Sequence, residues 1–118
     1  MRAAIAIAFA LASAPASAAT SETQAVDLVF KAVHRLYPRE PLRCFSVTTE
    51  ESSRRAFELA VRENHKSGCG GDPRVMPVRD RFRVTRSPLQ LSRWDAASDS
   101  YRRCRLANAR RPRCPRSD

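Results

Sequence analysis

The chain has 118 residues and a formal net charge of +10, from 22 lysines and arginines against 12 aspartates and glutamates. A chain of this length can bury one modest hydrophobic core, which excludes a multidomain protein. Its charge is unevenly spread, because residues 101–118 hold seven arginines and one acid, whereas residues 20–100 hold fourteen basic and eleven acidic side chains. This asymmetry predicts a nearly neutral folded body followed by a strongly basic tail.

Residues 1–19 have the three parts of a secretory signal peptide. Residues 1–2 are a short basic start, residues 3–11 are apolar throughout, and residues 16–18 read Ala-Ser-Ala, which fits the cleavage pattern. The apolar run is shorter than the roughly 20 residues that a transmembrane helix needs. We therefore expect a periplasmic or secreted protein that folds in an oxidising compartment.

The mature chain contains four cysteines: Cys44, Cys69, Cys104 and Cys114. An even number in a small exported domain indicates two disulfides. Among the three connectivities, we favour Cys44–Cys69 and Cys104–Cys114, because each closes a short loop. Each bridge would stabilise the fold by roughly 2–4 kcal/mol, mainly by restricting the unfolded chain.

The segment from Ser21 to Tyr37 predicts an amphipathic helix. Ser21 and Gln24 have the spacing of a capping box, in which each side chain bonds the other residue's backbone N–H. Pro38 ends the helix because it cannot donate a backbone hydrogen bond. Apolar residues recur at intervals of three and four and form one stripe: Val26, Val29, Phe30, Val33, Leu36 and Tyr37.

Four later segments predict strands, at residues 44–49, 56–64, 78–85 and 89–94. In the second of these, apolar residues alternate with polar or small ones, which favours a half-buried strand, although the spacing also fits a helix. We favour the strand there and leave the helix as the alternative. Tyr101 is a candidate start for a short fifth strand.

These elements predict an α+β domain at residues 20–105, with one N-terminal amphipathic helix packed on a four-stranded antiparallel meander. Residues 106–118 form the basic C-terminal tail. Because the tail contains few apolar residues, we expect it to be mostly disordered except where Cys104–Cys114 ties it.

Three short segments carry a resemblance to other proteins: FELAVRE at 57–63, CGGDP at 69–73 and DRFRV at 80–84. With the helix-then-meander order, they resemble small uncharacterised exported bacterial proteins with a PepSY-like or cystatin-like arrangement. The resemblance spans roughly residues 21–101 and leaves the arginine tail outside. It implies a domain that binds or inhibits rather than catalyses, and it also favours a strand at 56–64.

Catalytic and metal-binding interpretations are weaker than structural ones. Cys69 follows His65 by four residues, which suits a reactive thiol and its base, but an oxidising compartment favours a disulfide in a turn. Zinc ligands usually occur in close pairs, whereas the nearest cysteines here are ten positions apart. Gly70 and Gly71 lack the further residues of a phosphate loop and predict a turn. We expect no catalytic residues, metal or cofactor.

One strand of the predicted sheet carries a row of arginines. Arg79, Arg81 and Arg83 share a face of residues 78–85, with Arg93 as a further candidate on the next strand. If the helix covers the opposite face, this row would bind carboxylates or phosphates, and Trp94 would be an aromatic anchor beside it. The alternatives are arginines paired with neighbouring acids in solvent, and a Trp94 side chain that wraps around the sheet edge into the core.

The arginine tail is the strongest charge signal and suits a polyanion or a membrane surface. Few aromatic residues accompany it, which argues against nucleic acid; the alternative is a tail that only aids solubility. Its arginines are Arg102, Arg103, Arg105, Arg110, Arg111, Arg113 and Arg116.

We therefore predict an exported, non-catalytic binding module, an inhibitor or accessory factor of another cell-envelope protein. The alternative is a polyanion or membrane-surface binder that acts through the tail, with peripheral membrane contact. The basic charge disfavours a basic target such as lysozyme, because binding surfaces are usually complementary in charge. We expect a monomer.

Overall fold

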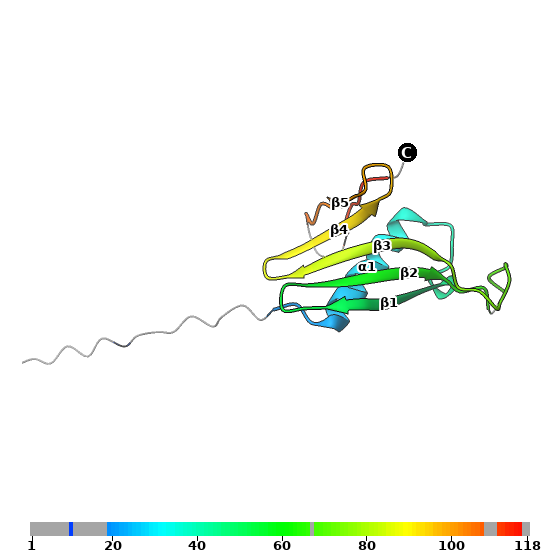
Figure 1. The fold of residues 1–118 in the computed structure, drawn as a ribbon, viewed down its shortest axis with the longest axis horizontal. Coiled ribbons are helices and arrows are strands. Elements are labelled where there is room, and N and C mark those ends of the chain that lie inside the picture. Colours follow the sequence, from blue (N-terminus) through cyan, green and yellow to red (C-terminus); the bar gives the residue numbers. More distant parts are fainter. Residues whose placement is uncertain (1–9, 11–18, 67, 108–110, 117–118) are drawn as a thin grey trace, which may run out of the picture.

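The computed structural model describes residues 10, 19–66, 68–107 and 111–116. Within these residues, five strands form one antiparallel sheet in the order β1-β2-β3-β4-β5, and α1 lies behind it in the view of Figure 1. The predicted α+β class and antiparallel meander are confirmed, with the fifth strand added to the predicted four. The elements are α1 (Glu22–Leu36), η1 (Leu42–Cys44), β1 (Phe45–Ser52), β2 (Ala56–Glu63), β3 (Val78–Arg86), β4 (Leu89–Asp95) and β5 (Ser100–Arg103).

The helix begins at the predicted capping box. The Gln24 backbone N–H donates to Ser21 Oγ at 3.2 Å, and the Ser21 N–H donates to Gln24 Oε1 at 2.9 Å. Tyr37 is the C-cap, immediately before Pro38. The buried stripe differs in part from the predicted one: it consists of Ala25, Leu28, Val29, Ala32 and Val33. The other predicted members are only partly buried against the core: Val26, Phe30, Leu36 and Tyr37. No helix in the described part of the chain has the length and hydropathy to span a membrane.

The hydrophobic core lies between α1 and one face of the sheet. Residues 56–63 form a strand, so the favoured interpretation of this segment is confirmed. On the covered face, Leu59 is paired with Phe82 and Val84 with Leu91, and all four side chains are fully buried. Burial of each such side chain contributes about 1.5–3 kcal/mol. The core thus fixes which face of each strand points inward.

Both favoured disulfides are present. Cys44–Cys69 joins η1 to the loop between β2 and β3, and Cys104–Cys114 joins the residue after β5 to the tail. The described tail residues are also held in other ways: Pro112 is fully buried, and Arg105 and Arg113 exchange two backbone hydrogen bonds of 2.7 and 2.9 Å. The tail therefore packs on the body at more points than the predicted disulfide tie. Most of the predicted signal peptide, and residues 108–110, lie outside the described residues.

Candidate functional site

The sheet face opposite α1 carries two of the predicted arginines. Arg81 is paired with Ala60 in the sheet register and Arg83 with Glu58, which places both on the uncovered side. Arg81 forms an ion pair with Glu50, whose other carboxylate oxygen lies 3.5 Å from Arg62. The alternative interpretation, in which the arginines pair with neighbouring acids, therefore holds for Arg81.

Arg79 does not share this face, and that part of the prediction is wrong. A β-bulge lies between the pairs Val61–Asp80 and Arg62–Val78, so the regular alternation of side chains breaks at Arg79. Its guanidinium carbon lies 4.1 Å from the centre of the Tyr37 ring, at the end of α1.

Two carboxylates hold the Arg79 guanidinium on the helix side. Its Nη1 lies 2.6 Å from Glu40 and 3.7 Å from Glu63. The hydrogen bond with Glu40 raises the pKa of Arg79 above its ordinary value. The Arg79 side chain therefore extends from β3 to the C-terminal end of α1, where its positive charge is held in place.

Trp94 lies on the open side of the sheet, half-buried against Tyr101. The two rings meet edge to face, with their centres 5.2 Å apart and a 73° angle between their planes. Burial raises the pKa of Tyr101, and the nearby charge of Glu58 raises it further. The positive charges of Arg81 and Arg83 oppose that shift. The aromatic pair is thus surrounded by charged side chains rather than folded into the core.

Arg93, the further candidate, is buried on the helix side, so it does not join the open face. Its Nε donates to Asp80 Oδ1 at 2.8 Å, and the two side chains are only 9% and 6% exposed. Nη1 donates to the Pro115 carbonyl at 2.8 Å, and Nη2 donates to the Tyr37 hydroxyl at 3.2 Å. This guanidinium links β4 to β3, to the end of α1 and to the tail.

The Tyr37 hydroxyl completes this buried network. It donates to Asp80 Oδ2 at 2.5 Å while it accepts from Arg93. Burial, and then the hydrogen bond to Asp80, raise the pKa of Tyr37. The sequence carried a signal for the inward position of Arg93, because it shares the strand parity of the buried Leu91.

A cleft opens where β3 and β4 separate. Within the described sheet, β3 pairs with β4 only from Phe82, opposite Arg93, so residues 78–81 have no partner in β4. The resulting cleft has a volume of about 520 Å³. We call it the β3–β4 cleft; it is lined by Tyr37, Val78, Arg79, Asp80, Arg81, Arg93, Trp94 and Ala96. It brings together Arg79, Arg81 and Trp94, whereas Arg83 lies outside it.

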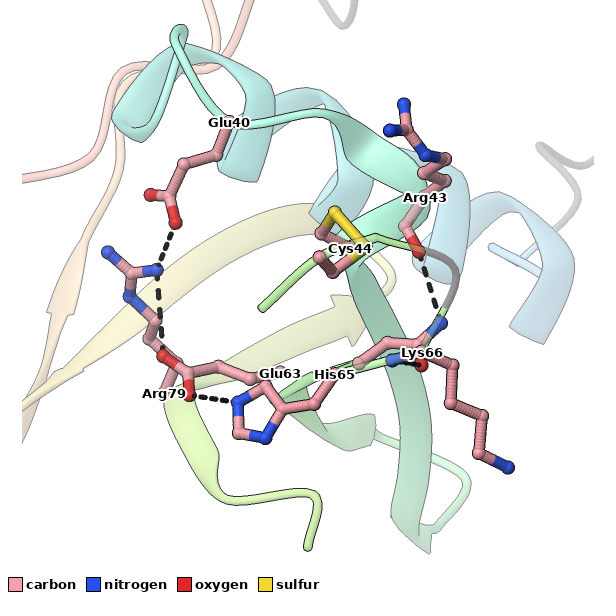
Figure 2. Close-up of a disulfide and its surroundings, with 9 residues drawn as sticks. Glu40, Arg43, Cys44, Glu63, His65, Lys66 and Arg79 are labelled. Carbon is pink, nitrogen blue, oxygen red and sulfur yellow. Dashed lines mark hydrogen bonds and ion pairs between the residues drawn. A yellow bond between two sulfur atoms is a disulfide. The ribbon is translucent and has the colours of Figure 1, made fainter. Parts of the chain in front are cut away.

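Cys69 and His65, the residues of the disfavoured catalytic interpretation, both have structural roles in this fold. Cys69 is bonded to Cys44, and His65 Nε2 lies 3.0 Å from Glu63 (Figure 2). His65 Nδ1 lies 2.9 Å from the Asp72 carbonyl. The hydrogen bond with Glu63, and then that with the Asp72 carbonyl, raise the pKa of His65. The imidazole thereby fastens the β2–β3 loop to the end of β2.

The tail arginines are distributed over several surfaces. Arg102 lies 3.8 Å from Asp95, and Arg103 donates to Gln90 at 3.2 Å. Arg110 lies outside the described residues. A hollow of about 270 Å³ between α1 and the tail is lined by three arginines and no acid; its lining is Ala32, Arg35, Leu36, Pro112, Arg113, Cys114 and Arg116.

Metal-ligating side chains do not gather within the described residues, where no group of three histidines, cysteines or carboxylates could hold an ion.

Comparisons with protein-family models, with curated proteins and with solved structures each found no match. The features of the described chain that suit a partner are the β3–β4 cleft and the hollow between α1 and the tail.

Proposed function

We propose that this protein is an exported, non-catalytic binding module that docks an acidic segment of another cell-envelope protein at the β3–β4 cleft. The observation that carries the proposal is the cleft itself, where Arg79 and Arg81 lie on one strand and Trp94 on the next. The two disulfides support an oxidising, extracytoplasmic setting.

The cleft is preorganised for such a partner. Arg79 is held over Tyr37, and Trp94 is packed against Tyr101, so both side chains have already lost much of their conformational freedom. Preorganised aromatic and arginine side chains are the usual anchors of protein interfaces. Arginine also binds carboxylates through two parallel hydrogen bonds, which favours an acidic partner.

The test is capture of envelope proteins on the immobilised mature chain at high salt, followed by affinity measurement with the purified partner. Replacement of Arg81 by Gln together with Trp94 by Ala should raise the Kd by roughly thirtyfold or more, as loss of central anchors does. The matched control, Arg54→Gln with Leu89→Ala, removes one arginine and one exposed apolar residue far from the cleft and should leave the Kd unchanged.

Thermal unfolding of each variant checks that the fold is intact. A partner bound equally well by the cleft variant and by the control would contradict docking at the cleft.

A second candidate is polyanion binding at the hollow between α1 and the tail. Arg35, Arg113 and Arg116 line it without an acidic neighbour in the lining, which is unfavourable unless an anion or solvent balances their charges. Phosphate or sulfate groups on a polymer fit this chemistry because arginine binds them through several donors.

Elution from a heparin column tests this candidate in the full-length chain. Replacement of Arg35, Arg113 and Arg116 by Gln should lower the salt concentration needed for elution more than replacement of Arg39, Arg54 and Arg55, which removes the same charge elsewhere. Equal shifts would indicate that net charge alone governs binding, and would contradict a site at the hollow.

A further inference from the structure

Exposed apolar side chains gather at one end of the molecule. Five large apolar residues of the described chain are exposed, and four of them belong to η1, to the β2–β3 loop of residues 64–77, or to the start of β3. Leu42 is 40% exposed, Val75 49% and Met76 41%. The loop extends beyond the sheet at the right of Figure 1, and η1 lies at its base. We call Leu42, Arg43, Lys66, Arg74, Val75 and Met76 the loop end.

The two segments of the loop end are tied together. The Cys44–Cys69 disulfide joins them, the Asn64 backbone N–H donates to the Cys44 carbonyl at 2.8 Å, and the Asn64 side chain donates to the Arg43 carbonyl at 3.1 Å. The His65 clamp adds a further tie within the loop (Figure 2). The apolar side chains are thus presented on a braced scaffold, and exposure of this kind usually marks an interaction surface.

The acidic groups near the loop end are already bonded to cations. Asp72 pairs with Arg74, and Glu40 pairs with Arg79. Glu63 bonds His65 and also lies near Arg79.

Arg43 and Lys66 form no ion pair among the described residues, and their side chains point away from the disulfide in Figure 2. The charge left over at this end of the molecule is therefore positive.

We propose that the loop end docks on an anionic phospholipid surface. Val75, Met76 and Leu42 would enter the boundary between headgroups and acyl chains, and Arg43 and Lys66 would contact the headgroup phosphates. A mixture of projecting apolar side chains and free cations is the pattern of peripheral membrane attachment. A projecting loop also suits a soft bilayer better than a protein cavity, because it needs no complementary hollow. This surface is separate from the β3–β4 cleft and from the tail.

Such docking would fix the orientation of the domain. The strands lead toward the loop end in Figure 1, so the sheet would stand away from the membrane and its open face would point sideways. The β3–β4 cleft lies at the start of β3, next to the loop. A membrane-bound partner would therefore meet the cleft close to the bilayer surface.

Co-sedimentation with lipid vesicles tests the proposal. The mature, full-length protein should bind vesicles of phosphatidylglycerol and phosphatidylcholine, and should bind phosphatidylcholine alone much more weakly. Replacement of Val75 and Met76 by Asp should weaken partitioning by at least about tenfold. Replacement of Arg43 and Lys66 by Gln should weaken it by roughly thirtyfold, from two basic contacts.

Matched controls lie at the opposite end of the sheet. Leu89→Asp places a charge at an exposed apolar residue, and Arg54→Gln with Arg55→Gln removes two cations from a turn; both should retain vesicle binding. The full-length Arg113→Gln, Arg116→Gln variant asks whether the tail accounts for binding instead. Absence of vesicle binding by the unaltered chain, equal losses in loop-end and control variants, or loss in the tail variant alone would each overturn the proposal.

Hydrogen exchange of the unaltered protein provides a readout that does not depend on variant folding. The amides of Arg74, Val75 and Met76 should exchange more slowly when anionic vesicles are present, while those of the β1–β2 turn should not change. Unchanged exchange in the loop would contradict membrane docking there, as would a loop end that captures a protein partner but no vesicles.

Discussion

Arg93 and Arg81 lie on adjacent strands but on opposite sides of the sheet, and they are held very differently. Arg93, beneath α1, donates to a carboxylate, a phenol and a backbone carbonyl and is almost fully buried. Arg81, on the open side, pairs with one carboxylate and remains 42% exposed. The same type of side chain therefore braces the fold where a helix covers it and stays partly exposed to solvent where nothing covers it.

The largest effect should come from breaking the covered pair. Asp80→Asn leaves the Arg93 cation buried without its counter-charge, and we expect the free energy of unfolding to fall by about 3–5 kcal/mol. Chemical denaturation monitored by circular dichroism measures this loss. A fall below about 1 kcal/mol would mean that Arg93 is not held as a buried ion pair.

A smaller loss should follow from a substitution in the β2–β3 loop. Gly71 has φ +77°, and an added Cβ would lie 2.7 Å from the His65 ring. We expect Gly71→Ala to lower the free energy of unfolding by about 2–4 kcal/mol, from backbone strain and steric overlap together. Gly70→Ala is the matched control, because Gly70 has φ +75° but no heavy atom within 4 Å of the added Cβ, and it should lose only about 1 kcal/mol. Equal losses in the two variants would show that the His65 clamp does not constrain the loop.

The corresponding change on the open side should matter least for stability. Glu50→Gln removes the carboxylate that pairs with Arg81 and Arg62, just as Asp80→Asn removes one from Arg93. Since the groups on the open side are partly exposed, we expect a loss below about 1 kcal/mol. A loss as large as that of Asp80→Asn, measured in the same denaturant, would erase the difference between the two sides.

The His65 clamp should open as the pH rises. Because the folded state raises the pKa of His65, the stabilisation should be fully present below the ordinary histidine pKa and should be lost as the pH rises through the raised value. Glu63→Gln should move the His65 titration, followed by NMR, to lower pH. A titration that Glu63→Gln does not move would contradict the role of that carboxylate.

Periodicity and capping chemistry were sufficient to predict most of the fold. The helix start could be recognised from Ser21 and Gln24, and the inward faces of β2 to β4 from alternation, because these signals are local. The bulge at Arg79 was not recognisable, since one extra residue near the start of a strand breaks the alternation of side chains there without any change of composition. The predicted row of three arginines was therefore reduced to two.

The β3–β4 cleft depends on contacts between distant segments. Its base joins Tyr37 to Asp80, 43 positions apart, and Arg93 to Pro115, 22 positions apart. Arg93 was grouped with the open-face arginines although its strand parity with Leu91 is that of an inward residue, and no local signal named its partners. Likewise, the burial of Pro112 could not be predicted, because the sequence around it is typical of a solvated segment. Pro112 is buried only because the tail packs against the body of the domain.

The hydrogen bond from Arg93 to the Pro115 carbonyl also ties the described tail residues to the sheet. The sheet joins strands that are consecutive in sequence, so its pairings close over short stretches of chain. The buried guanidinium, in contrast, gains its last acceptor only from residues near the C-terminus. A chain shortened at residue 105 would lack that acceptor and the partner of Cys104, so the described tail residues contribute to the stability of the sheet.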